Sequence, residues 1–82
     1  MSDEFQLPRV FVDFNNADKQ GRIRLNTVGT IRDLDRLGVV LQEGSELILS
    51  CLELEAEGRA IYSEDEHLWV ASINWDQIRE LS

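Results

Sequence analysis

Apolar and polar positions alternate in two segments of the first third of the chain, the pattern of half-buried β-strands. In residues 9–14 every second side chain is apolar, and the β-branched and aromatic content favours extended structure. In residues 22–26, Ile23 and Leu25 face one side while arginines face the other. The polar stretch 15–21 between them ends in glycine, as hairpin loops often do. We therefore expect the two segments to pair as an antiparallel hairpin.

Helical spacing replaces alternation in the next segment. Three apolar residues recur three positions apart and so share one face of a helix: Ile31, Leu34 and Leu37. Thr30 stands three residues before Asp33, which resembles a capping box, and Gly38 suits the left-handed residue just past a helix end. These signals predict a short helix over residues 31–37 that packs its apolar residues on the sheet. A bent strand through residues 27–31 is the alternative.

The segment 46–57 carries apolar residues on both faces of an extended chain. It is therefore either covered on both faces or changes face at a bulge near Ser50. From Leu52 onward the alternation is regular, with Leu52, Leu54 and Ala56 on one face. Three glutamates form an acidic row on the opposite face: Glu53, Glu55 and Glu57.

Residues 59–63 and 68–73 are strand-like runs on either side of a polar loop, and they predict a second hairpin. In the C-terminal run, Asn74 or Asp76 can cap a short helix. We expect this helix to pack three apolar side chains on the sheet: Trp75, Ile78 and Leu81.

These elements predict one α+β domain over residues 1–82, mostly β. We expect a small curved sheet, or an SH3-like, partly open barrel, of about five strands with two short helices. Residues 1–8 are expected to form a flexible N-terminal arm.

Composition limits the setting in which the chain works. With 43% hydrophobic residues in 82, the chain is too apolar to be a disordered segment. Cys51 is its only cysteine, so no intramolecular disulfide can form, which is typical of a reducing compartment. Asp3 and Glu4 stand where a leader would carry basic residues, and no apolar run is long enough to cross a membrane. We expect a cytoplasmic protein with no membrane association.

The residues offer little for catalysis or metal binding. Cys51 and His67 are the only cysteine and histidine, and they fall in an apolar segment and a charged turn. Structural zinc usually takes four such ligands, and the acidic run Glu64, Asp65 and Glu66 lacks the spacing of a calcium loop. We expect no catalytic residue, no cofactor and no metal, and therefore not an enzyme.

One stretch carries the motifs of a DNA-binding family. A GRI-x-L strand, an LG helix end and a G-S-x-L strand fall within residues 18–49, with matches at Gly21, Arg22, Ile23, Leu25, Leu37, Gly38, Gly44 and Leu47. This stretch resembles the AbrB or MazE type of swapped-hairpin domain, although Asn26 replaces the proline and the strand-to-helix connection is longer. The resemblance implies a DNA-binding or antitoxin-type role. A sequence pI of about 4.4 argues against nucleic acid as the partner.

Charge favours a different kind of partner. The net charge is −8, and residues 42–82 carry all of it because residues 1–41 sum to zero. We therefore expect a protein-interaction or regulatory module that binds another protein or a second copy of itself. An acidic inhibitor of a basic toxin or nuclease is a further alternative. The candidate surface residues are the arginine stripe, the acidic row and one aromatic anchor: Arg22, Arg24, Glu53, Glu55, Glu57 and Trp69.

Overall fold

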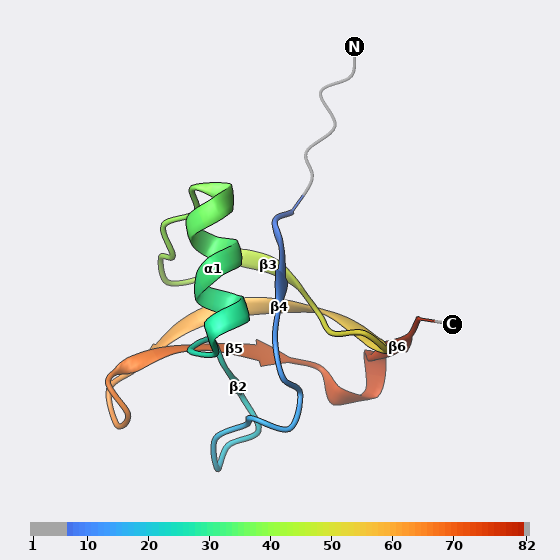
Figure 1. Cartoon of the computed structure of the whole chain (residues 1–82). Coiled ribbons are helices and arrows are strands. Elements are labelled where there is room, and N and C mark those ends of the chain that lie inside the picture. The colour runs from blue at the N-terminus through green and yellow to red at the C-terminus, as the bar shows by residue number, and fades with distance from the viewer. Residues whose placement is uncertain (1–6, 82) are drawn as a thin grey trace.

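A computed structural model describes residues 7–81 as a curled, half-barrel sheet with one α-helix beside it (Figure 1). The elements are β1 (Arg9–Phe11), β2 (Ile23–Arg24), α1 (Val28–Leu37), β3 (Glu46–Ser50), β4 (Leu54–Ser63), β5 (Leu68–Ile73), the 3₁₀ turn η1 (Trp75–Gln77) and β6 (Arg79–Glu80). The sheet runs in the order β1-β3-β4-β5-β2, and β6 adds to β4. The expected α+β, mostly β fold is confirmed, with one α-helix and a 3₁₀ turn instead of two helices.

The expected first hairpin is wrong in its pairing. β1 pairs in parallel with β3, and β2 pairs antiparallel with β5, so the two segments lie at opposite ends of the sheet order. β2 does belong to a tight hairpin, but the other arm of that hairpin is residues 16–18 and not β1. Arg24 N–H donates to Asn16 O, and Asp18 N–H donates to Arg22 O. Alternation shows which face a side chain takes, and it does not show which strand lies beside it.

The core lies on one face of the curled sheet and follows the predicted alternation. Val10 of β1, Leu49 of β3 and Ala56 of β4 are register partners and all are buried. Gly58 leaves room in this layer, because a Cβ there would lie 2.9 Å from Cδ1 of Leu49. The other buried apolar residues of this cluster are Val12, Phe14, Ile23, Leu25, Leu47 and Ala71.

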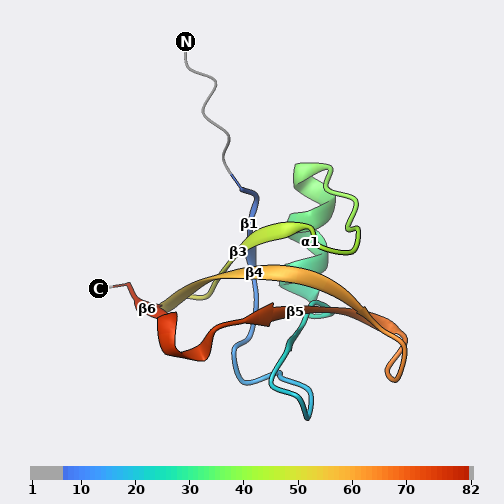
Figure 2. The ribbon, with the colours of Figure 1, turned by 180° about the vertical axis from the view of Figure 1, so that it is seen from behind.

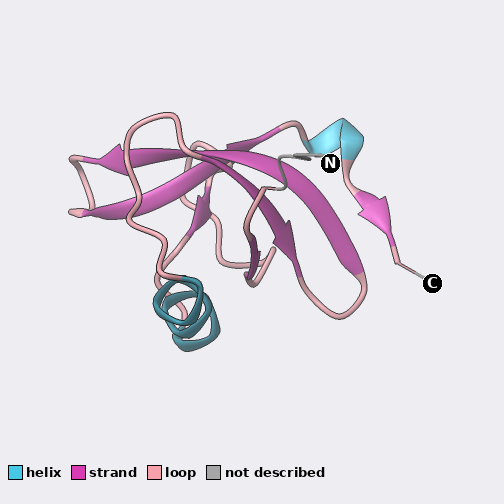
Figure 3. Ribbon diagram, turned by 90° about the horizontal axis from the view of Figure 1, so that it is seen from above, coloured by secondary structure: helices cyan, strands magenta, loops and turns pink. Residues whose placement is uncertain are grey.

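Helix α1 stands at the outer edge of β1, at one side of the sheet (Figure 3). Thr27 caps the helix by accepting from Thr30 N–H, and Gly38 ends it with a left-handed φ of 68°. The prediction of a helix ending at Gly38 is confirmed, whereas the expected Thr30 cap and the bent-strand alternative are wrong. The helix begins three residues earlier than expected, so Thr30 lies inside it.

Two side chains of α1 hydrogen-bond to the free edge of β1. The Thr30 hydroxyl donates to Phe11 O over 2.5 Å, and the Asp33 carboxylate accepts from Phe11 N–H over 2.8 Å. Thr30 is fully buried, whereas Ile31 is 55% exposed. The helix is therefore rotated relative to the expected packing through three apolar residues, and it protects an edge strand from pairing with other chains.

The segment 46–57 contains a tight turn in place of one long or bulged strand. Cys51 N–H donates to Leu54 O, so the chain reverses between β3 and β4. Leu52 lies at this turn and is 92% exposed, which contradicts its expected alignment with Leu54 and Ala56. No glycine, proline or asparagine marks the turn, so the usual sequence signal is missing.

The second predicted hairpin is confirmed. β4 and β5 pair antiparallel from Gly58↔Ile73 to Ser63↔Leu68, and Trp69 packs edge-to-face on Tyr62 with ring centroids 5.4 Å apart. The tip of this hairpin and β6 lie at the two ends of β4 (Figure 2). β4 therefore sets the long dimension of the sheet.

The C-terminal helix is shorter than expected. Asn74 caps η1 as predicted, by accepting from Asp76 N–H, but the chain leaves this turn at Ile78 and adds β6 to β4. Trp75 is 47% exposed and donates from Nε1 to Gly21 O, so it fastens the 18–22 turn instead of filling the core. Ile78 packs against the core as expected.

The N-terminal arm expected over residues 1–8 lies mostly outside the described residues. Its last two, Leu7 and Pro8, are half-buried, and Pro8 O accepts from Ile48 N–H of β3. Among residues 7–81, no helix has both the length and the apolar character needed to cross a membrane.

Candidate functional site

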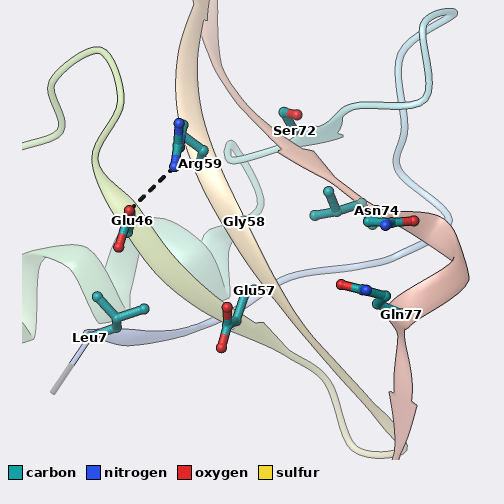
Figure 4. Close-up of a pocket in the computed structure, with 9 residues that line it drawn as sticks. Leu7, Glu46, Glu57, Gly58, Arg59, Ser72, Asn74 and Gln77 are labelled. Atoms are coloured by element: carbon teal, nitrogen blue, oxygen red, sulfur yellow. Dashed lines mark hydrogen bonds and ion pairs between the residues drawn. The ribbon is translucent and has the colours of Figure 1, made fainter.

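A shallow groove lies on the face of β3, β4 and β5 that turns away from the core. It consists of three adjoining hollows of about 410, 750 and 210 Å³, and Glu57 of β4 lines all three. Figure 4 shows Glu57 between Leu7 on one side and the amides of Asn74 and Gln77 on the other. Arg36 and Leu37, at the C-terminal end of α1, line the opposite end. We call this surface the Glu57 groove.

Strand register brings the groove residues together. Ile48 is the partner of Glu57, and Glu46 is the partner of Arg59, so alternate residues of β3 and β4 meet on this face. Leu7 and Leu37 add apolar surface beside Ile48. The groove thus combines one aliphatic wall, around Ile48, with a larger number of polar and charged side chains elsewhere in its lining.

Glu57 is the one charged lining residue for which the described part of the chain supplies no ion-pair partner. Arg59 pairs with Glu46 over 3.3 Å, and Arg36 pairs with Asp33 over 3.3 Å. The two remaining arginines of the groove, Arg9 and Arg79, both pair with Glu55. Among the described residues, Glu57 is therefore the only unpaired charge of the groove, but the lining as a whole is not acidic, because Arg9 and Arg79 share the single carboxylate of Glu55.

Glu55 is buried between two arginines at the end of the sheet. Arg79 donates to Oε1 over 3.1 Å from Nη2, and Arg9 pairs with Oε2. These two hydrogen bonds hold the pKa of Glu55 below its ordinary value, against the effect of burial, which would raise it. The three strands β1, β4 and β6 are thereby joined through one carboxylate.

A second polar cluster joins the 18–22 turn to the β4–β5 hairpin. Arg24 donates to both carboxylate oxygens of Glu66, over 2.7 and 2.8 Å, and also to Asn16 and to Ala17 O. The hydrogen bonds from Arg24 hold the pKa of Glu66 below its ordinary value. This guanidinium is therefore used within the chain.

Asp18 organises the turn beside this cluster. Its carboxylate accepts from the backbone N–H groups of Gln20 and Arg22 and from the Arg22 guanidinium, each over 2.9 Å. Burial alone would raise the pKa of Asp18, but these hydrogen bonds outweigh it and the pKa is lowered. Arg22 is therefore committed to the turn.

The structure disperses the candidate surface residues expected from the sequence. Arg22 and Arg24 are in the internal ion pairs just described, and Glu55 is held by two arginines. Glu53 is exposed in the β3–β4 turn, Glu57 lies in the groove, and Trp69 is half-buried against the core. The expected arginine stripe thus has both guanidinium groups engaged.

The sequence-based candidates for chemistry do not converge. Cys51 precedes β4 and His67 follows it, so ten residues of extended strand, about 30 Å, separate the two side chains. Of the acidic run, Glu66 is paired with Arg24. Within residues 7–81, no three His, Cys, Asp or Glu side chains are grouped as metal ligands.

The ion pairs leave a strong imbalance of free charge. Six of the eight cationic side chains pair within the chain, and only Lys19 and Arg32 have no ion-pair partner among the described residues. Nine described carboxylates likewise have none: Asp13, Asp35, Glu43, Glu53, Glu57, Glu64, Asp65, Asp76 and Glu80. Sequence reasoning counted the charges correctly, but their pairing depends on contacts between distant segments.

Several of these free carboxylates lie around β6. Glu80 is the register partner of Leu54, and Leu81 N–H donates to Glu53 O, which brings Leu81 onto the β3–β4 turn. Two leucines of this end are exposed, Leu52 by 92% and Leu81 by 42%. We call this surface the β6 end; it comprises Leu52, Glu53, Asp76, Glu80 and Leu81.

Comparison with known proteins adds no family: no family model, curated protein or solved structure matches this chain.

Proposed function

We propose that this chain is a small protein-interaction module that binds a basic partner protein through its β6 end. The observation that carries this proposal is the free charge: nine described carboxylates without an ion-pair partner against two such cations. Complementary charge speeds association and selects the partner, and the exposed leucines supply apolar contact. A basic nuclease or toxin is one member of this partner class. The lone cysteine suits action in the cytoplasm.

The same charges make DNA a poorer partner. A protein that binds duplex DNA neutralises phosphates with arginine and lysine, and the affinity depends on how many are available. Arg22 and Arg24, the arginines of the strand that resembles a DNA-binding family, are paired with Asp18 and Glu66. We therefore favour the basic protein.

The test uses the full chain, immobilised and exposed to extract of the cells that encode it. We expect it to retain basic proteins that are released when salt rises from about 0.1 to 0.5 M. The Debye length is about 10 Å at 0.1 M and shortens as salt is added, so attraction between exposed charges is screened. The double variant Glu53→Gln, Glu80→Gln should retain less. A matched control, Glu64→Gln with Asp65→Asn, removes the same charge at the opposite end of β4 and should retain as much as the natural chain.

Two results would overturn the proposal. One is equal retention by both variants, which would show that the β6 end is not the binding surface. The other is salt-sensitive binding of random duplex DNA that Arg32→Ala weakens, which would favour the DNA-binding alternative.

A further inference from the structure

The outward face of α1 carries two exposed aliphatic side chains that the rest of the described chain leaves uncovered. Val28 is 71% exposed and Ile31 is 55% exposed. Arg32 lies within about one turn of both, so the three side chains share this face. Arg32 and Asp35, which lies on the same face, have no ion-pair partner among the described residues, so the face presents one free cation and one free carboxylate beside two aliphatic side chains.

The Glu57 groove has the complementary composition. It presents one free carboxylate beside the aliphatic side chains of Leu7, Leu37 and Ile48. Two hollows of about 410 and 750 Å³ fall in the size range of clefts that bind ligands or side chains. Four arginines line the groove as well, so an aliphatic surface that carries one free cation and one free carboxylate matches it: the cation can meet Glu57, and the carboxylate can meet an arginine.

We propose that a second copy of this chain occupies the groove, with Arg32 of one copy paired to Glu57 of the other and Val28 and Ile31 covering the aliphatic wall. This homodimer goes beyond the proposed binding of a basic partner, which uses the β6 end. Arg36 and Leu37 of α1 line one end of the groove, so each copy carries both surfaces side by side. Adjoining complementary surfaces allow a two-fold axis to close the pair. Asp35, on the same helix face, would then approach the Arg36 end of the partner's groove.

Charge and polarity favour the outward face of α1 over other segments of the chain as the occupant of the Glu57 groove. Lys19 is the other free cation, but Asp18 and Gln20 flank it, so it lacks the aliphatic neighbours that the groove would bury. The segment before Leu7 carries Asp3 and Glu4, which Glu57 would repel. Arg32 is thus the best match.

Sedimentation velocity of the full chain across a concentration series, up to about 0.5 mM, tests the proposal. We expect a dimer whose dissociation constant rises roughly tenfold or more in Glu57→Arg and in Arg32→Glu. The double variant carrying both reversals should recover most of the lost affinity, because it restores an ion pair of opposite charges between the two positions. Such recovery isolates the interaction energy of this pair. Glu64→Arg, at the far end of β4, is the matched control and should dimerise normally.

Thermal melting keeps the result interpretable. Glu57 and Arg32 make no ion pair within the described chain, so the midpoints of unfolding of the reversal variants should stay close to that of the natural chain. A chain that stays monomeric at every concentration, or a dimer that is equally tight in all variants, would overturn the proposal. So would retention of basic proteins that is lost in Glu57→Arg while the chain remains monomeric, because the groove would then belong to the partner.

Discussion

The hydroxyl of Thr30 is the most informative single group to remove. It is fully buried and donates to Phe11 O at the edge of β1, while its own oxygen also contacts the Thr27 hydroxyl over 2.6 Å. Thr30→Val keeps the side-chain volume but leaves the Phe11 carbonyl without its donor beside a fully buried side chain. An unsatisfied buried acceptor costs about 1–3 kcal/mol, so we expect a loss of about 2 kcal/mol in the free energy of unfolding.

Urea denaturation measures this loss directly, and in a domain of this length it corresponds to a fall in melting temperature of about 8–16 °C. Thr30→Ser is the matched control, because it keeps the hydroxyl and removes one methyl group, at a cost of about 1 kcal/mol. If Thr30→Ser proved more damaging than Thr30→Val, packing and not the hydrogen bond would hold α1 to β1. The edge-capping argument would then be wrong.

Three further predictions address the sheet and its charges. Hydrogen bonds lower the pKa of Glu55 from 4.5, so its contribution to stability is present above that pH and is lost as pH falls through the folded-state pKa. Urea titrations at successive pH values should therefore show a smaller loss of stability in acid for Glu55→Gln than for the natural chain. Gly58→Ala places a methyl group 2.9 Å from Leu49, so chemical denaturation should show a loss of about 1–3 kcal/mol. Leu52→Ser should change the free energy of unfolding by no more than about 0.5 kcal/mol, yet lower the retention of basic proteins.

Edge protection explains why a polar helix face matters more here than an apolar one. β1 has β3 on one side only, and its other side would expose Phe11 N–H and O to any free strand. The Thr30 hydroxyl donates to Phe11 O and the Asp33 carboxylate accepts from Phe11 N–H. Satisfying both backbone groups thus requires a donor and an acceptor three residues apart on the helix. Sequence reasoning assigned those two residues to a cap, because the same spacing serves both purposes.

The loop 41–45 does similar work on β4 beyond the end of β3. Gly44 N–H donates to Ala60 O, Ala60 N–H donates to Ser45 O, and the Glu43 carboxylate accepts from Tyr62 N–H over 2.7 Å. Within the described chain, loop and helix contacts thus complete edges that short strands leave open. Such contacts are needed in this sheet because every strand except β4 is short.

The order of hydrophobic and polar residues determined what is local in this protein. It predicted the burial of Val10 and Ile23, the left-handed end of α1 at Gly38 and the β4–β5 hairpin, because each depends on neighbouring residues and the period of one element. The net charge of −8 and its concentration in residues 42–82 were likewise readable from composition alone.

The tertiary structure decided everything that depends on which segments meet. It placed β1 beside β3, turned the chain at Leu52 without a turn residue, and joined Arg24 to Glu66 across 42 positions of sequence. Those ion pairs consumed the arginines that looked available and left Glu57 and Arg32 free. A charge becomes available to a partner only when no residue of its own chain lies within reach, and that is a property of distances in space, which a linear pattern does not contain.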